Sequence, residues 1–496
     1  MQIPLVILIF FETLAWQWLS LGAFVIAYMF VIYLVIKTLL QNRNPITTLS
    51  WVMILILVPF LGLVFYFLFG QKITKRWLFK RLHHKELQQM EQISNSQLKA
   101  LQNMNLLEDK YLYEYRKLIS LQLKNNSSFL SSNNEIIFYH NGYDLYEQIY
   151  EELKLATQYI HIQYYIFEEG EVSEKIMNIL IEKKKLGLEI IMILDGIGSR
   201  KFSKKSISLL QEIGIEVLIF RPVRFPSLTN KINNRNHRKI LIIDGKMAFT
   251  GGINIADKYK ARYSEKGFWR DTHLRIVGDS VKMLQAIFIV DRYTINRQII
   301  SNLSKYFPVV ADIKGKHVQI ATNSPESGYA NIHNAFFTAI TTAKTTIRLI
   351  SPYFIPDETL LMALKNAAMG GVKVEIILPG VKDSAFVQLT ARSYVQQLLK
   401  DGIKVYFYQK GFIHAKILLI DYLFSMVGSA NFDYRSFYHN FEVNTLIYDE
   451  KINQDLQKQF EIDKLDSEEI ILSKWRKRPR KDKLLESLAR LSAPLM

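Results

Sequence analysis

The feature of this chain that most constrains its fold is an internal repeat. Residues 231–254 read KINNRNHRKILIIDGKMAFTGGIN, and residues 408–431 read YQKGFIHAKILLIDYLFSMVGSAN. Five residues recur at one constant offset of 177 positions: His237, Lys239, Asp244, Gly251 and Asn254 correspond to His414, Lys416, Asp421, Gly428 and Asn431. A repeat of this kind predicts two units of the same fold in one chain.

Each copy lies in a segment where helical and strand patterns alternate. Helical spacing of apolar residues covers 143–155, 174–186, 331–342 and 358–369, and short β-rich runs cover 160–167, 189–194, 346–350 and 372–378. Such alternation is typical of α/β folds with helices on both faces of a mixed sheet. We therefore predict two pseudo-symmetric α/β/α sandwich halves, residues 136–310 and 311–450, whose histidine motifs meet at a shared crevice.

The repeated histidine motif holds the groups needed to attack a phosphodiester. The His and Lys of H-x-K are two residues apart, so on a strand both side chains leave the same face. One imidazole can attack phosphorus, lysines and asparagines can neutralise the phosphate oxygens, and a second imidazole can protonate the leaving alcohol. We expect no metal and no cofactor, because cationic side chains can stabilise the developing charge. A single such histidine is more often an ordinary polar residue, but two matched copies favour a catalytic pair.

An acid follows the asparagine in each half. Asp271 lies seventeen residues after Asn254, and Glu442 lies eleven residues after Asn431. A carboxylate can accept the second N–H of an imidazole, which orients the ring and favours the imidazolium form. We predict this role for Asp271 and Glu442, and a surface salt bridge is the alternative for each.

The doubled H-x-K-x4-D with G-[SG]-x-N resembles the phospholipase D superfamily over about residues 136–450. Further strings resemble the bacterial cardiolipin synthases in particular: NRNHRK (234–239), GGIN (251–254), GFWRDTHLRIVG (267–278), SPYFIPDE (351–358), GFIHAK (411–416), GSANFDYRSFYHNFE (428–442) and NPITTLSWVMILILVPFLGLVFYFLFG (44–70). One departure is Asp291-Arg292, where we expect an Asp-Trp pair; it lies outside the catalytic motifs.

The resemblance implies a two-step phosphatidyl transfer. One histidine displaces glycerol from phosphatidylglycerol and forms a phosphatidyl-histidine, and the other protonates that glycerol. The second histidine then deprotonates a second phosphatidylglycerol, which takes the phosphatidyl group and becomes cardiolipin. We expect His237 to be the nucleophile, although the near symmetry of the motifs leaves His414 open.

The resemblance also implies a set of site residues. The catalytic motifs consist of His237, Lys239, Asp244, His414, Lys416 and Asp421. Asn254, Asn431 and Ser429 are expected to bind phosphate. Asp244 and Asp421 are expected to support the strands rather than to take part in the chemistry.

Two apolar runs near the N-terminus are each long enough to cross a bilayer. Residues 19–36 and 51–69 carry no charge, and about 20 apolar residues span a hydrocarbon core. Residues 1–19 lack the basic start of a secretory signal. We predict a membrane anchor over 1–85 with two helices, in which Pro59 introduces a kink, followed by a helical linker over 86–135.

The net charge of +17 is concentrated beside these membrane segments and at the C-terminus. Eight cations and no acid lie between Lys37 and Lys85, and seven cations with one acid lie between Lys474 and Lys483. The positive-inside bias predicts a multi-pass protein of the cell membrane with its catalytic region in the cytoplasm. The near-neutral remainder argues against nucleic acid as a partner. Anionic phospholipids are the expected partners, and the oligomeric state stays open.

The C-terminal tail, 451–496, joins its basic cluster to leucines at helical spacing: Leu484, Leu485, Leu488, Leu491 and Leu495. This pattern predicts an interfacial amphipathic helix on anionic lipid, or alternatively a helix that packs on its own domain. The lone G-x-G after Asp195 is interpreted as an ordinary turn at a strand end.

Three functions remain in competition. The first is the transphosphatidylase described above, with phosphatidylethanolamine as a possible alternative donor. The second is a hydrolytic phospholipase D or nuclease that uses water as acceptor, and the third is a non-catalytic membrane scaffold. The chain has no cysteine, which excludes thiolate catalysis, disulfides and cysteine-bound metal centres. Intact His and Lys in both motifs argue against the scaffold.

Overall fold

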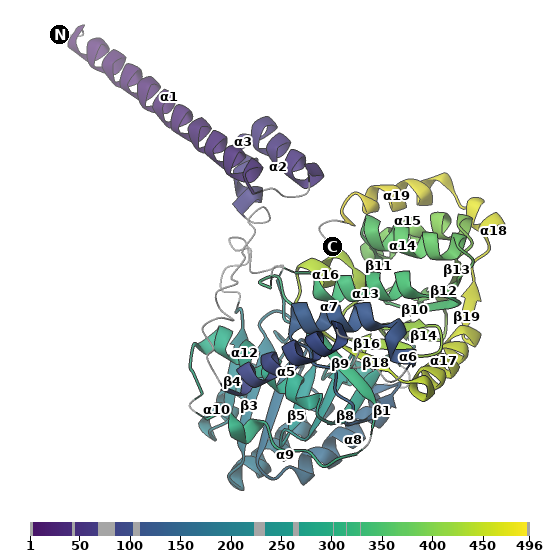
Figure 1. The fold of residues 1–496 in the computed structure, drawn as a ribbon. Helices are drawn as coiled ribbons and strands as arrows, with labels where there is room; N and C mark the ends of the chain where they lie inside the picture. The colour runs from purple at the N-terminus through teal and green to yellow at the C-terminus, as the bar shows by residue number, and fades with distance from the viewer. Residues whose placement is uncertain are drawn as a thin grey trace. The chain divides into compact units, whose positions relative to one another are not determined.

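The computed structural model describes residues 3–41, 45–67, 85–102, 110–222, 234–260, 267–300, 302–313, 315–327 and 329–493. The chain forms two compact units (Figure 1). The smaller unit holds the N-terminal helices α1 to α3, and the larger unit holds every element from α5 onward. Each unit is described on its own.

Among its described residues, the smaller unit contains one helix long enough to cross a membrane. α1 runs over Ile3–Leu39, and its segment Leu21–Leu39 has the length and the apolar composition of a membrane span. The prediction of a helix over 19–36 is therefore confirmed. The basic run between Lys72 and Arg81 lies outside the described residues.

The second apolar run does not form the single kinked helix predicted over 51–69. α2 covers Pro45–Leu57 and α3 covers Pro59–Phe65. The break falls at Val58, because Pro59 has no N–H to continue the α2 hydrogen bonds and restricts the residue before it. The rings of Trp51 and Tyr66 lie 5.7 Å apart, so α3 folds back along α2.

A glycine permits this sharp turn. A side chain at Gly62 would approach the carbonyl oxygen of Ile54 to 2.7 Å, so only a residue without Cβ fits there. Buried side chains of α1, of α2 and of the residue that caps the end of α3 form a small core, to which Val31, Leu34, Leu55 and Tyr66 contribute. The apolar run of the sequence is thus a compact helical hairpin.

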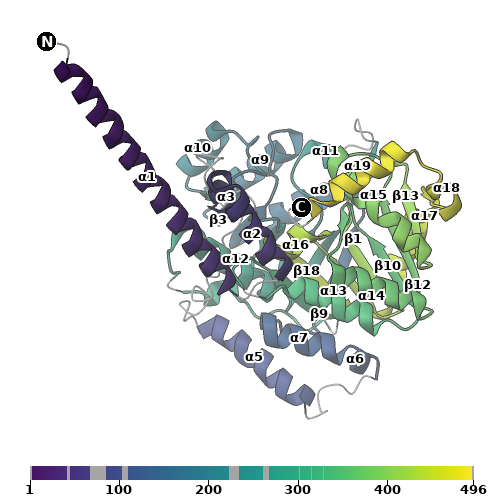
Figure 2. The same ribbon diagram turned by 90° about the horizontal axis from the view of Figure 1, so that it is seen from above.

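The larger unit is built on two mixed sheets (Figure 2). The first has the order β1-β8-β6-β5-β2-β3-β4. Its strands are β1 (Asn134–Tyr139), β2 (Tyr159–Tyr164), β3 (Glu189–Asp195), β4 (Glu216–Phe220), β5 (Ile240–Ile243), β6 (Met247–Gly251) and β8 (His273–Gly278). Strands β2, β3 and β4 are parallel, and the remaining neighbours are antiparallel.

The second sheet repeats this order as β19-β13-β12-β10-β15-β16-β18-β9, with β19 added at one edge. Its strands are β9 (His317–Asn323), β10 (Thr346–Ile350), β12 (Lys373–Pro379), β13 (Lys404–Tyr408), β15 (Ile417–Ile420), β16 (Phe424–Gly428), β18 (Glu442–Tyr448) and β19 (Ser467–Glu469). The matching topology confirms the two pseudo-symmetric halves predicted from the repeat.

Helices complete the layers on both sides of each sheet. The first half contains α8 (Gly142–Leu155), α9 (Glu171–Lys185), α10 (Lys204–Glu212), α11 (Asp257–Lys260) and α12 (Val281–Asn296). The second half contains α13 (Asn331–Thr342), α14 (Glu358–Met369), α15 (Ala385–Lys400), α16 (Tyr434–Tyr438) and α17 (Glu450–Leu465). A short 3₁₀ helix covers Ser304–Tyr306 between the halves.

The two halves share a central hydrophobic core. Apolar side chains of α12 and α17 pack in one cluster with side chains from both sheets, including Ile240, Ile276, Ile417 and Val443. α8 and α9 cover the outer face of the first sheet, and α13, α14 and α15 cover the outer face of the second. The halves are therefore two layers of one folded body.

The predicted linker belongs to this body. α5 (Lys85–Gln102), α6 (Lys110–Glu114) and α7 (Arg116–Asn126) are helical, as expected, but α7 packs in the core of the second half. The linker ends in the Ser/Asn-rich stretch KNNSSFLSSNN (124–134), whose composition predicts an exposed loop, but this stretch is also anchored. Ser128 is fully buried, and its hydroxyl accepts from the backbone N–H of Ile320 at 3.0 Å.

The C-terminal region is likewise more integrated than predicted. α17 supplies core residues, and β19 pairs with β13 through Tyr406 and Glu469. The second half thus extends past residue 450, and the true C-terminal appendage is α18 (Leu472–Arg476) with α19 (Arg480–Arg490). Leu495 lies outside the described residues.

Candidate active site

The two histidine motifs sit at the starts of equivalent strands. His237 and Lys239 lead directly into β5, and His414 and Lys416 lead into β15. In both halves this strand runs antiparallel to a neighbour, β2 or β10, so the motif lies beside the carboxyl end of that neighbour. The buried runs Ile240–Ile243 and Ile417–Ile420 fix the strands in the core and hold the motifs at the edge of each sheet.

Main-chain contacts join each histidine to the opposite half. The backbone N–H of His237 donates to the carbonyl of Phe441 at 2.9 Å, and that of His414 donates to the carbonyl of Arg270 at 2.6 Å. The second contact extends a parallel pair between β7 (Phe268–Arg270) and β14 (Gly411–Ile413). Another small pair, β11 (Phe354–Ile355) with β17 (Phe432–Asp433), lies within the second half.

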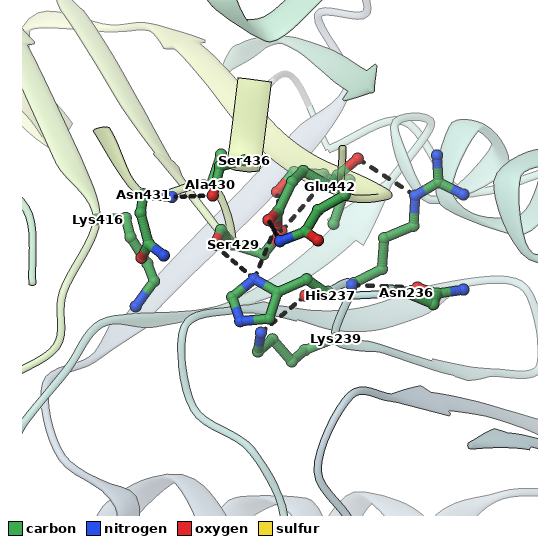
Figure 3. A network of polar contacts seen from close by, with 12 residues as sticks. Asn236, His237, Lys239, Lys416, Ser429, Ala430, Asn431, Ser436 and Glu442 are labelled. Carbon is green, nitrogen blue, oxygen red and sulfur yellow. Dashed lines mark hydrogen bonds and ion pairs between the residues drawn. The ribbon is translucent and has the colours of Figure 1, made fainter. Parts of the chain in front are cut away.

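Each of the two acids also contacts the histidine of the opposite half. His414 Nδ1 lies 2.6 Å from Oδ2 of Asp271, which belongs to the first half. His237 Nδ1 lies 3.0 Å from Oε2 of Glu442, which belongs to the second half, and 3.1 Å from the carbonyl oxygen of Ser429 (Figure 3). Both predicted acids therefore face a histidine, and each faces the histidine of the other half.

The turn after β6 and the turn after β16 differ in a way that suits the two acids. In the first half, a side chain at Gly252 would approach Oδ1 of Asp271 to 2.0 Å, so glycine leaves room for the carboxylate. In the second half Ser429 occupies the equivalent position, and its hydroxyl donates to Oε2 of Glu442. Ser429 is fully buried and its hydroxyl holds Glu442, and its expected binding of phosphate stays a prediction.

Burial and neighbouring charges shift the protonation of the histidines. Burial, helped by Lys416 and opposed by Asp271, lowers the pKa of His414 to about 4. Burial also lowers the pKa of His237, although Glu442 opposes the shift. Burial alone would raise the pKa of both acids, but the facing histidine and lysine outweigh it and keep each pKa below its usual value. Both acids are therefore charged at neutral pH.

The two lysines are buried beside the histidines. Burial lowers the pKa of Lys239 to about 7 and that of Lys416 to about 8. Each lysine donates to the carbonyl oxygen of the histidine two residues before it, Lys239 to His237 at 2.7 Å and Lys416 to His414. Lys416 Nζ also lies 2.9 Å from the ring nitrogen Nδ1 of His414. Figure 3 shows Lys239 and Lys416 across the His237 ring from Glu442. The additional contact of Lys416 with the His414 ring is one departure from symmetry in the site.

The two predicted asparagines line the same cavity as the histidines. The Asn254 amide donates to the hydroxyl of Tyr259 at 2.7 Å, so a tyrosine positions it. The side-chain oxygen of Asn431 is buried and has no hydrogen-bond partner among the described residues. That oxygen is an acceptor, so it is available to a hydrogen-bond donor of a ligand that enters the cavity.

Asp244 and Asp421 lie at the opposite ends of the motif strands. Both residues have a left-handed backbone, with φ of 52°. The Asp244 carboxylate accepts the backbone N–H groups of Thr157, Gln158 and Tyr159, and Asp421 accepts those of residues 344–346 in the same way. The structure therefore separates both aspartates from the histidines and places them at the starts of β2 and β10.

The cavity has a volume of about 380 Å³ and contains residues that the motif analysis did not single out. Tyr165 and Tyr353 follow equivalent strands of the two halves and both line it, so comparison of the two repeats had the signal to find them. Trp269 and Asn440 precede Asp271 and Glu442 by two residues and also line it. Arg435, Lys258 and Asp383 bring further charge to the wall.

Buried ion pairs support the His237 segment from behind. Arg235 pairs with Asp195 at 2.7 Å, and Arg238 pairs with Asp291 at 2.5 Å. Asp195 ends β3 and also accepts the N–H groups of the following turn, so the G-x-G there is the ordinary strand-end turn that was predicted. Arg292, the departure from the family pattern, pairs with Glu216 on β4.

Comparisons with protein families match both units. A family model described as "Cardiolipin synthase, PLD-like domain" matches residues 149–288 and again residues 336–464. A second model, described as "Phospholipase_D-nuclease N-terminal", matches residues 26–71. The first match covers both α/β halves, and the second covers the N-terminal helices.

Curated relatives match nearly the whole length. A cardiolipin synthase from Staphylococcus aureus is 36% identical over 478 residues, which cover 96% of each chain. A cardiolipin synthase from Clostridium perfringens is 39% identical over 464 residues, which cover 92% of this chain and 96% of the relative.

Among solved structures, the phosphatidylserine synthase of Haemophilus influenzae is similar in fold. It aligns with a TM-score of 0.59 at 13% identity and covers 78% of this chain and 98% of that one. At this identity the match supports the double α/β architecture alone.

Proposed function

Because this chain belongs to the cardiolipin synthase family of phospholipase D-like proteins, we propose that it joins two phosphatidylglycerol molecules into cardiolipin and releases glycerol. The observation that carries the proposal is the pair of histidines at one cavity, each backed by an acid and a lysine. A phosphatidyl transfer of this kind needs one nucleophile and one acid–base group, and the site holds two imidazoles for these roles.

The contacts of Nδ1 support different roles for the two histidines. His237 Nδ1 faces two acceptors, the carboxylate of Glu442 and the carbonyl of Ser429, so the neutral ring carries its proton there. Its Nε2 then has a free lone pair, as a nucleophile requires. His414 Nδ1 lies closer to its acid, 2.6 Å from Oδ2 of Asp271, and this short contact stabilises the imidazolium form, which carries a proton on Nε2 that it can give away.

In the first step, Nε2 of His237 attacks the phosphorus of the donor phosphatidylglycerol. The P–N bond forms while the bond from phosphorus to the glycerol oxygen breaks, and His414 gives its Nε2 proton to that oxygen. Glycerol leaves, and the phosphatidyl group remains on His237. The entering phosphate anion favours the imidazolium form of His414 and so opposes the burial that lowers the pKa of this ring.

In the second step the acceptor phosphatidylglycerol supplies a hydroxyl. His414 takes the hydroxyl proton while the oxygen attacks phosphorus, the P–N bond breaks, and His237 returns to its neutral form. Lys239, Lys416, Asn254 and Asn431 are assigned to the phosphate oxygens, where a cation or amide donor stabilises the developing charge. The two steps consume two phosphatidylglycerols and release one glycerol and one cardiolipin.

The test is the product ratio of the purified full-length protein with phosphatidylglycerol in detergent. We expect glycerol and cardiolipin in equal amounts, and we expect His237→Ala and His414→Ala each to abolish transfer. His333→Ala, which changes a histidine outside the cavity, is the matched control and should retain activity. Phosphatidic acid in place of cardiolipin would indicate the hydrolytic alternative, and normal transfer in either histidine variant would contradict the two-histidine scheme.

We also propose that the catalytic halves lie on the cytoplasmic side of the cell membrane. The folded-back pair α2–α3 is too short to cross a hydrocarbon core of about 30 Å, so it suits a re-entrant hairpin beside a single crossing by α1. With that arrangement all eight cations from Lys37 to Lys85 lie on one side, in agreement with the positive-inside bias.

Because the chain lacks cysteine, single cysteines can report this topology. A cysteine at the exposed Gln41, after α1, should react with an impermeant thiol reagent only when the cytoplasmic face is open. A cysteine at the exposed Ser96 on α5 should behave in the same way. Reaction of position 41 from outside intact cells would instead support the multi-pass arrangement with two crossings.

A further inference from the structure

The helix α19 turns a charged side chain toward its own domain and leucine side chains toward the solvent. Its inward side carries Glu486, which is 3% exposed and pairs with Arg392 at 3.3 Å and with Arg478 at 2.6 Å. Its outward side carries leucines, of which Leu484 is 61% exposed, Leu488 is 54% exposed and Leu491 is 79% exposed. An amphipathic helix of a soluble surface has the reverse arrangement, with apolar residues inward.

These leucines lie together on one stripe. Leu484, Leu488 and Leu491 are spaced four and three residues apart, so they share a helix face, and Leu485 widens it. Such a contiguous exposed apolar stripe is characteristic of a surface that is covered by something else.

Exposed basic residues lie before the leucine stripe in the chain. Five exposed basic residues precede the leucines: Lys474, Arg476, Lys477, Arg480 and Lys481. The only acid of α19 besides the buried Glu486 is Asp482, on the inward side. A leucine face with basic residues beside it matches an anionic bilayer surface, which offers acyl chains below a layer of phosphate groups.

The helix also lies close to the catalytic cavity. α19 runs along α15, as both ribbon views show (Figures 1 and 2), and the two are joined where Thr390 donates to the carbonyl of Ala489 at 3.3 Å. Val387, in the first turn of α15, lines the cavity. A bilayer in contact with α19 would therefore be one helix away from the cavity wall.

We propose that the outward face of α19, with the basic segment before it, docks the catalytic unit on an anionic lipid surface. Docking buries the leucine stripe among acyl chains and brings the cations to the headgroups. It acts in addition to the N-terminal helices, because it belongs to the catalytic unit itself. Each basic residue at the surface is expected to contribute about a fivefold increase in partitioning at low salt.

The chain's lack of cysteine permits a direct test in the full-length protein. Leu488→Cys carries an environment-sensitive fluorophore, and the protein is reconstituted either in phosphatidylcholine vesicles or in vesicles that also contain phosphatidylserine. Phosphatidylserine is chosen because the proposed reaction does not consume phosphatidylserine as its donor. The readout is the position of the label, so it stands apart from any loss of catalysis. Leu186→Cys, 73% exposed in the first half, is the matched control.

We expect the label at position 488 to shift to the blue and to be quenched by nitroxide lipids only in the anionic vesicles. High salt, or replacement of the five exposed cations by Gln, should reverse the shift, and the label at position 186 should stay in water. A label at 488 that remains in water in anionic vesicles would overturn the proposal. So would an equal shift in both vesicles that grows with protein concentration, which would indicate a second copy of the chain.

Discussion

At the scale of single residues, the site depends on two contacts in which the acid of one half meets the histidine of the other half. Asp271 holds His414 and Glu442 holds His237. If His237 is the nucleophile, Glu442 orients the attacking ring, and Asp271 serves the ring that protonates the leaving group. The crossed pairing therefore assigns each acid to a different part of the first step, which kinetics can separate.

We predict that Asp271→Asn and Glu442→Gln each lower kcat on phosphatidylglycerol by about 10²–10⁴-fold, since an amide supports the wrong tautomer of the ring. A phosphatidyl ester of p-nitrophenol needs no protonation of its leaving group. The release of p-nitrophenol from this ester should be nearly normal in Asp271→Asn and slow in Glu442→Gln. The opposite pattern would mean that the acids serve the histidines in the reverse roles.

The buried lysines predict how activity depends on pH. Burial lowers the pKa of Lys239 to about 7 and that of Lys416 to about 8, so both lose their charge as pH rises through this range. Because the charged forms are proposed to neutralise the phosphate, kcat/KM should fall above pH 7 to 8. The measurement is the pH profile of kcat/KM in detergent micelles of constant composition. A profile that stays flat to pH 9 would contradict this role for the lysines.

At the scale of elements, the two ends of the repeated histidine motif serve different purposes, although their spacing is the same in both copies. His and Lys start the motif strand at the cavity, whereas Asp ends it and holds the start of the neighbouring strand. The motif is thus a structural unit as well as a catalytic one. This explains why the aspartate recurs at the same offset as the histidine without sharing its cavity.

We predict that Asp244→Ala lowers the free energy of unfolding by about 3 kcal/mol, because buried N–H groups lose a charged acceptor and alanine disfavours the left-handed backbone. Asp244→Asn, which tolerates that backbone and still accepts hydrogen bonds, should lose less. Urea denaturation measures both variants. Folded Asp244→Ala should keep its kcat, and a loss as large as that of His237→Ala would assign this aspartate to the chemistry.

Many of the helices and strands were predictable from the sequence. The helix over Asn331–Thr342 and the strand over Thr346–Ile350 end where the periodicity predicts, because short buried elements between turns leave little choice. The apolar run 51–69 was predicted wrongly, since composition reports burial in lipid and not the fold-back that Gly62 permits. The composition of the Ser/Asn-rich stretch around Ser128 predicts an exposed loop wrongly, because polar residues that bond to a neighbouring strand resemble a linker in sequence.

At the scale of the whole catalytic unit, the halves cannot act alone. They share a central core, and each supplies the acid that the other half's histidine needs. The repeat predicted the shared crevice, but no spacing in the sequence indicates that the acids cross over. That fact follows from the packing of two sheets around the layer of α12 and α17, which is a long-range property of the fold.

In the proposed mechanism the two halves form one site, in which His237 carries the phosphatidyl group and His414 moves the proton. The most direct measurement uses His414→Ala and the p-nitrophenyl phosphatidyl ester, whose leaving group departs without an acid. We predict a burst of about one p-nitrophenol per protein and, by mass spectrometry, a phosphatidyl adduct on His237, with neither in His237→Ala. A burst in His237→Ala with an adduct on His414, or no adduct on either histidine, would contradict the account.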